Sequence, residues 1–239
     1  MRIALIGDNK IISLSTFDKI FMNKVILRSF LIAMTLIPLQ SGAQELKESG
    51  ADAKQIVPTG WELVEATGDL NGDGVNDLVL IATPNNKEKM TTRDDGYIYN
   101  FNQPVLAIYW GQKGGGFKLF KQYSKVVPAR EDEFVSITPS LSITKKGALV
   151  IDLEYFVTAG SYTQPTSSHT FRYQNGDFFL IGKEATELER TTGKTVVTSD
   201  NYLTGKRCVT TGNISRKKTK AKWSKLPKRP LVPMGETLE

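Results

Sequence analysis

The chain has 239 residues, 40% of them hydrophobic, and a formal net charge of +6 at pH 7. This length and apolar fraction suffice for one substantial core or two small ones, and they exclude a disordered chain. The chain contains one Cys and one His. An intramolecular disulfide and a metal site with two imidazoles are therefore excluded, and stability must come from packing or from a bound ion.

A secretory signal peptide is predicted over residues 1–43, with the start at Met22. Lys24 and Arg28 form a basic segment, residues 31–39 are apolar, and Ser41-Gly42-Ala43 supplies small residues for cleavage. The residues before Met22 are either an over-long reading of the gene or an extension of the basic segment. The apolar run is shorter than the roughly 20 residues that span a membrane, and no later segment approaches that length.

The mature protein is therefore expected to begin at about Gln44, without a transmembrane segment, in the periplasm or outside a bacterial cell. A bacterial lipoprotein would carry a Cys directly after the cleavage site, but Cys208 is the only Cys. We therefore do not expect a lipid anchor. Residues 44–60 are expected to form an N-terminal linker, and residues 61–211 a β domain.

An acidic loop, GDLNGDGVND at residues 68–77, places Asp or Asn at alternate positions between small residues. Calcium takes six to eight oxygen ligands, and alternate positions of a tight loop can direct several oxygens at one point. Three crowded carboxylates would repel each other without a cation. The loop therefore predicts a structural calcium site, and a metal-free turn rich in Asp and Asn is the alternative. The candidate ligands are Asp69, Asn71, Asp73, the backbone carbonyl of Val75, and Asp77.

Strands are predicted from Trp61 onward, where short apolar and β-branched runs alternate with Gly, Asn, Asp and Pro. Residues 77–82 are apolar after their first Asp and predict a strand buried on both faces. Three hairpins are indicated by GQKGGG, KKG and NGD between apolar runs. The predicted strand pairs are 105–110 with 117–121, 140–144 with 148–156, 170–174 with 178–181 and, from a weaker pattern, 195–198 with 207–211. Sequential hairpins predict an all-β fold, mainly an antiparallel meander.

The acidic loop resembles the calcium loop of FG-GAP repeats, the blade units of integrin-type β-propellers. Their pattern D-x-N-x-D-G-x-x-D, followed by an apolar strand, is matched by residues 69–77 and the following LVLIA. Further along, IYWGQKGGGF resembles the hairpin that ends such a blade, so the resemblance spans about residues 61–120. An EF-hand is excluded because its twelfth loop position, a Glu, is here Leu80. The resemblance implies that Asp69, Asn71, Asp73, the carbonyl of Val75 and Asp77 bind Ca²⁺.

A complete propeller is not expected, because it needs about four or more blades and no second DxDxDG block follows. We expect one FG-GAP-like unit within a single β domain. The segments TFRYQNGDFFLIG and DNYLTGKR resemble a family of secreted bacterial proteins that combine one such loop with this C-terminal half. That resemblance implies no activity.

Two polar loops, residues 85–103 and 159–168, are candidate binding surfaces, because long loops in compact domains often carry function. Surface insertions without a partner are the alternative. His169 is expected to be a polar residue at a strand end. Asp152 and Glu154 lie two apart on one strand face, either as a carboxylate pair or as the solvated side of a half-buried strand. The chain has neither a phosphate-binding loop nor a dinucleotide fingerprint.

Residues 212–239 are predicted to form a basic, flexible tail. Residues 206–239 contain 10 basic and 2 acidic side chains, whereas residues 44–205 contain 16 and 21. The basic residues alternate with Trp223 and prolines, which suits an arm that contacts an anionic surface or an acidic partner. A solvated end is the alternative. Export makes a nucleic-acid partner unexpected.

These features favour an exported calcium-binding β-protein that serves as a binding or interaction module for a protein or glycan, and not as an enzyme. One alternative is a secreted hydrolase that uses carboxylates such as Asp152 and Glu154. Another is a periplasmic inhibitor or immunity-type protein whose loop 85–103 blocks a partner enzyme.

Overall fold

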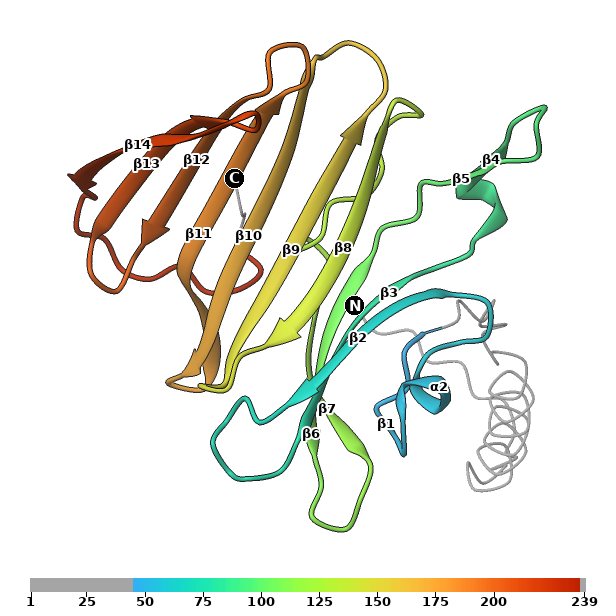
Figure 1. Cartoon of the computed structure of the whole chain (residues 1–239). Coiled ribbons are helices and arrows are strands. Elements are labelled where there is room, and N and C mark those ends of the chain that lie inside the picture. The colour runs from blue at the N-terminus through green and yellow to red at the C-terminus, as the bar shows by residue number, and fades with distance from the viewer. Residues whose placement is uncertain (1–44, 237–239) are drawn as a thin grey trace, which may run out of the picture. The chain divides into compact units, whose positions relative to one another are not determined.

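Strands dominate residues 45–236, the part of the chain that the computed structural model describes (Figure 1). Every pair of neighbouring strands there is antiparallel, which confirms the predicted all-β class. The predicted signal peptide lies outside the described residues. The elements are β1 (Ser49–Gly50), α2 (Ala53–Ile56), β2 (Glu62–Gly68), β3 (Asp77–Thr83), the 3-10 turn η1 (Lys87–Lys89), β4 (Met90–Thr92), β5 (Ile98–Asn100), β6 (Val105–Gly111), β7 (Phe117–Tyr123), β8 (Val135–Ile143), β9 (Ala148–Val157), β10 (Thr163–Gln174), β11 (Asp177–Glu189), β12 (Lys194–Asn201), β13 (Lys206–Asn213) and β14 (Arg216–Lys225).

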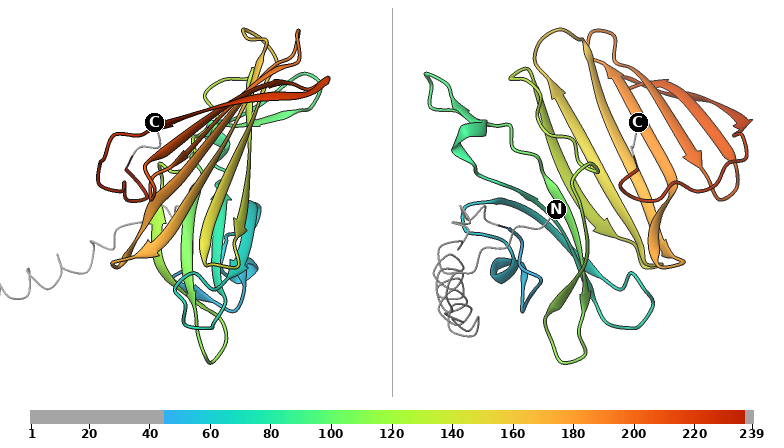
Figure 2. Two further views of the ribbon diagram at one scale, coloured as in Figure 1. Left: turned by 60° about the vertical axis from the view of Figure 1, so that its left-hand side comes forward. Right: turned by 180° about the vertical axis from the view of Figure 1, so that it is seen from behind.

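Two larger sheets and one small hairpin are formed. The five-stranded sheet has the order β1-β7-β6-β3-β2, and β4 pairs only with β5. The seven-stranded sheet runs from β8 to β14 with each strand beside its neighbour in sequence, as Figure 2 shows from two sides. All predicted hairpins are confirmed: β6 with β7, β8 with β9, β10 with β11, and β12 with β13.

β3 is buried on both faces, as its continuous apolar run predicts. Val79 and Ile81 belong to the main core, between the five-stranded and seven-stranded sheets. Leu78, Leu80 and Ala82 face the opposite side and belong to a second core. Because successive side chains of a strand point to opposite faces, this single strand contributes to both cores.

The N-terminal segment, residues 46–57, covers the second face of the five-stranded sheet, which differs from the linker expected over residues 44–60. Its residues Leu46, Ala53 and Ile56 belong to the second core. Asp52 caps α2 by accepting a bond from the Gln55 amide at 2.9 Å. The segment is too short to show a periodic apolar pattern in the sequence. Its role becomes clear only in the structure, where it covers β3.

Aromatic side chains join the two larger sheets. The ring centroids of Trp110 and Phe120 are 4.6 Å apart, and those of Tyr173 and Phe178 are 5.3 Å apart. Trp110 also meets Tyr173 edge-on at 5.0 Å. Such edge-on and tilted contacts add to the burial of these large rings. A polar contact lies beside them, where Lys121 bonds the Asp177 carboxylate at 2.6 Å.

The C-terminal residues up to Glu236 extend the fold, which differs from the boundary expected at residue 211 and from the flexible tail expected over residues 212–239. The last three residues of that predicted tail lie outside the described residues. β14 pairs with β13 along the edge of the seven-stranded sheet. The chain then returns to β11, where the Leu180 amide donates to the Val232 carbonyl at 2.9 Å (Figure 1). Met234 is only 3% exposed. Basic side chains are compatible with this strand because the edge of a sheet leaves them in solvent.

Candidate functional site

The acidic loop connects β2 to β3 in the five-stranded sheet, where Gly68 pairs with Asp77. Gly72 and Gly74 have φ angles of +81° and +80°. These left-handed conformations favour glycine and let the chain turn twice within the loop.

Side-chain oxygens organise the loop by accepting hydrogen bonds from its backbone. This pattern holds Asp69, Asn71 and Asp73 in successive tight turns. The hydrogen bond from the Gly74 amide makes the largest contribution to a lowered pKa of the Asp69 carboxyl. The bonds are Gly72 N to Asp69 Oδ1 at 2.7 Å, Gly74 N to Asp69 Oδ2 at 2.9 Å, Asp73 N to Asn71 Oδ1 at 2.9 Å, and Val75 N to Asp73 Oδ1 at 2.8 Å.

Asp77 is the buried member of the predicted ligand set, with 0% of its surface exposed. One carboxylate oxygen accepts the Leu70 amide at 2.8 Å, and the other accepts the Gly111 amide at 3.0 Å. Burial raises the pKa of Asp77 against the effect of these two bonds, and the nearby charges of Asp73 and Asp69 raise it further. The carboxylate therefore ties the start of the loop to the end of β6.

The predicted ligands lie in one loop, but their carboxylates do not form a cluster in this conformation. Within residues 45–236, no three Asp, Glu, His or Cys side chains are close enough together to hold a metal ion. The donor chemistry nevertheless fits calcium, because all candidate ligands are hard oxygens. Each carboxylate oxygen also keeps a second lone pair beside its backbone bond. Calcium binding by this loop stays a prediction.

Gly111 allows the end of β6 to touch the acidic loop. A Cβ at this position would lie 2.1 Å from the Asn76 carbonyl oxygen and 2.8 Å from Val75 Cγ1. Glycine is therefore required for the close approach that brings its amide to Asp77. The loop and the GQKGGG hairpin meet here although more than thirty residues separate them, and the sequence alone gave no signal for this contact.

An insertion, residues 84–104, separates β3 from β6 and contains η1, β4 and β5 (Figure 1). The predicted binding loop 85–103 is thus largely ordered. The Asn100 side chain closes its base by donating to the Pro84 carbonyl and to Glu62, both at 3.0 Å. The second predicted loop, 159–168, is mostly part of β10.

Two adjoining hollows of about 460 Å³ each border the insertion, the first with β2 and β8 and the second with β8 and the end of β9. We call them the insertion groove; Tyr97, Arg130 and Ser136 line both. Large apolar side chains gather around the groove with much of their surface exposed. They are Leu63 at 36%, Tyr97 at 52%, Ile98 at 52%, Phe134 at 49% and Phe156 at 56%.

A buried tyrosine, Tyr99, lines the second of these hollows. Tyr99 is 5% exposed, and its ring meets that of Tyr97 edge-on with centroids 4.9 Å apart. The Arg130 guanidinium lies 4.4 Å from the Tyr99 ring centroid, and Arg93 donates to the Tyr99 hydroxyl at 3.1 Å. The groove therefore has a wall in which an arginine covers one aromatic ring and a second ring packs against it edge-on.

Phe134 and Phe156 were not predicted as site residues. Phe156 occupies the outward side of β9, where the alternation of Asp152 and Glu154 predicts a polar residue. A phenylalanine at a position where the alternation predicts a polar residue is the sequence signal that could have indicated this site. Asp152 is half-buried and Glu154 exposed, and neither lines the insertion groove.

His169 lies within β10 and not at a strand end, with 3% of its surface exposed. Neither ring nitrogen has a hydrogen-bond partner among the described residues. Burial lowers its pKa to about 4, with the charge of Lys183 acting in the same direction and that of Asp152 opposing it. His169 is therefore a neutral core residue near pH 7.

The comparisons with known proteins bear on the first half of the five-stranded sheet. Residues 64–101 match the FG-GAP repeat. The match occurs once and runs through most of β2, the acidic loop, β3 and most of the insertion. The chain matches no curated protein and no solved structure. FG-GAP repeats are β-structured, typically extracellular units that mediate protein interactions.

The sheet that contains the matched residues continues beyond them. β2, β3, β6 and β7 form a four-stranded antiparallel meander, in which the predicted GQKGGG hairpin supplies the last two strands. One FG-GAP-like unit in an all-β fold was the prediction, and both parts of it are confirmed. Among residues 45–236, no helix is both long and apolar enough to cross a bilayer.

We predict that Gly111→Ala destabilises the fold by roughly 1–3 kcal/mol, because the new methyl group must displace the Asn76 carbonyl and weaken the bond to Asp77. Urea denaturation measures this difference. Gly114→Ala is the matched control in the same hairpin, since a Cβ there meets no atom within 4 Å. Its change should stay within about 0.5 kcal/mol. Equal stability of both variants would contradict the close contact.

Proposed function

We propose that this chain is an exported interaction module that binds a protein partner in the insertion groove. The supporting observation is the gathering of exposed apolar side chains around a groove with a rigid aromatic wall. Large exposed apolar patches mark interaction sites, and interface centres are enriched in aromatic residues and arginine. The FG-GAP match supports an interaction role.

A protein is favoured over a glycan because the groove combines aromatic rings with aliphatic side chains. Leu63 and Ile98 offer no hydrogen bonds to a sugar, but they suit an apolar side chain of a partner. The inhibitor or immunity-type role remains one form of this proposal, in which the insertion occupies a partner enzyme.

Calcium is the proposed ion of the acidic loop, held by Asp69, Asn71, Asp73, the carbonyl of Val75 and Asp77. When bound, it would neutralise carboxylates that now raise the pKa of Asp77. The loop precedes β3 and the insertion follows it, so the ion would stabilise the strand that carries the groove. This proposal is supported by the donor chemistry, because all five candidate ligands are hard oxygens within one short loop.

Binding is proposed in preference to hydrolysis. Asp152 and Glu154 stand on the outward side of β9, opposite to the core residues Ile151 and Leu153. That arrangement is typical of the solvated face of a half-buried strand. Export to the periplasm or the cell exterior rests on the signal-peptide prediction and on the usual setting of FG-GAP repeats.

We predict that Ca²⁺ raises the melting temperature and that EDTA reverses the gain. At a hundredfold excess over Kd, binding to the folded state alone adds about 2.7 kcal/mol, which corresponds to roughly 5–10 °C for a protein of this size. Asp73→Ala should abolish the difference between calcium and EDTA. Asp94→Ala, an exposed carboxylate outside the loop, should retain it. Identical melting curves of the unaltered chain in calcium and in EDTA would contradict calcium binding by the loop.

We predict that the double variant Tyr97→Ser and Phe156→Ser loses partner binding at least tenfold, because both rings leave the groove. Capture of periplasmic or secreted proteins of the native host by the tagged chain measures this. Tyr162→Ser is the control, since this tyrosine is 71% exposed and does not line the groove. Equal capture of one partner by all three proteins would show that it binds elsewhere. Capture of a polysaccharide alone would contradict a protein partner.

A further inference from the structure

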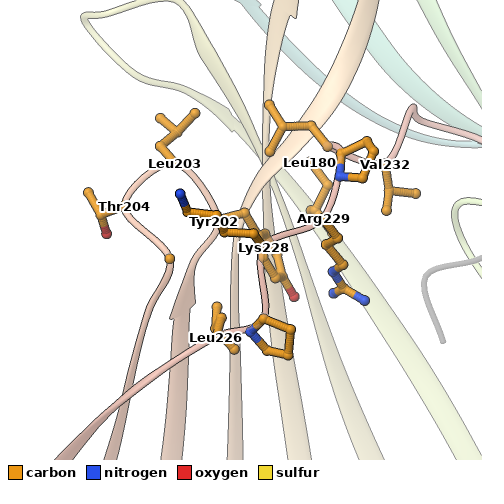
Figure 3. Close-up of a pocket in the computed structure, with 12 residues that line it drawn as sticks. Leu180, Tyr202, Leu203, Thr204, Leu226, Lys228, Arg229 and Val232 are labelled. Carbon is orange, nitrogen blue, oxygen red and sulfur yellow. The ribbon is translucent and has the colours of Figure 1, made fainter.

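A separate pocket of about 460 Å³ lies between the β12–β13 turn and a strap, residues 226–232, that leads back to β11 (Figure 3). Its volume is in the range of about 300–1,000 Å³ that is typical of ligand sites. The walls are mostly apolar. They comprise Leu180, Tyr202, Leu203, Leu226, Pro227, Pro230, Leu231 and Val232.

The strap is held in place by backbone bonds at both ends. The Leu226 amide donates to the Gly205 carbonyl at 2.9 Å, and the Leu180 amide donates to Val232 at 2.9 Å. Two prolines, Pro227 and Pro230, restrict the segment between these bonds. The pocket is therefore bounded by a restrained segment, although it lies within the part of the chain that composition predicts to be a tail.

Two cationic side chains line this apolar pocket. Lys228 and Arg229 are among its lining residues, and Figure 3 shows both on the strap. The pocket therefore combines an apolar wall with positive charge.

The Asp200 carboxylate, which interacts electrostatically with Arg229, already has a cationic partner. It accepts two bonds from the Arg207 guanidinium, both at 2.6 Å. Arg229 lies over the Tyr202 ring, 5.2 Å from its centroid. Among the described residues 45–236, Lys228 forms no salt bridge, so its charge is available to a ligand.

We propose that this strap pocket binds an anionic amphiphile, with the apolar chain between the strap and the β12–β13 turn and the phosphate or carboxylate on Lys228 and Arg229. Leu203, a lining residue in the turn, also suits a lipid because it is 49% exposed. Exposed apolar side chains beside basic ones are typical of proteins that contact the surface of an anionic membrane. This site is distinct from the insertion groove and goes beyond the proposed interaction with a protein.

Calorimetric titration of the full chain with dodecyl phosphate, below its critical micelle concentration, tests the proposal. We expect saturable binding, with binding of dodecyl maltoside at least tenfold weaker and none of inorganic phosphate. Lys228→Glu should weaken the binding of dodecyl phosphate at least tenfold because it replaces a positive charge by a negative one. Leu203→Asp should weaken it at least tenfold because it places a charge in the apolar wall. Lys113→Glu, an exposed lysine of the GQKGGG hairpin, is the matched charge control and should bind as the unaltered chain does.

Melting curves establish that each variant is folded, and the exposure of Leu203 and Lys228 favours this. Unchanged binding in both pocket variants, or equal binding of inorganic phosphate, would overturn the proposal. Vesicles of phosphatidylcholine with and without phosphatidylglycerol identify the source of the ligand. Binding that depends on phosphatidylglycerol and on Lys228 supports a membrane lipid, and binding of dodecyl phosphate alone supports a free amphiphile.

Discussion

The buried carboxylate of Asp77 is the contact on which the five-stranded sheet depends. It accepts amides from Leu70, at the start of the acidic loop, and from Gly111, at the end of β6. A buried carboxylate without such bonds would be strongly unfavourable. The loop, β3 and the GQKGGG hairpin are therefore fixed together before any ion is considered, and a cation would add to an arrangement that the backbone already holds.

The covering of β3 explains how one FG-GAP-like unit exists without a propeller. In a propeller the faces of a blade pack against neighbouring blades. Here the seven-stranded sheet covers one face, and residues 46–57 cover the other. The insertion between β3 and β6 remains at the surface, where exposed apolar side chains gather around the insertion groove.

Local sequence signals predicted the hairpins, because NGD, KKG and GQKGGG determine turns without distant contacts. They also placed the five candidate ligands in one loop and β3 inside the core. Long-range packing determined what they missed. The N-terminal layer needs β3 to cover, and β14 needs the edge of β13. Phe134 and Phe156 line one hollow only after β8 and β9 pair. The contact between Asp77 and the Gly111 amide likewise could not be predicted, because it forms only when distant parts of the chain pack together.

Hydrogen exchange of individual amides tests the central role of Asp77 most directly. The amides of Leu70 and Gly111 should exchange as slowly as those within β3, because opening them requires loss of the buried carboxylate contact. Amides of Gly72 and Gly74, which are exposed residues bonded to Asp69, should exchange much faster in the absence of calcium. Fast exchange at Leu70 and Gly111, at the rate of those loop glycines, would contradict the account.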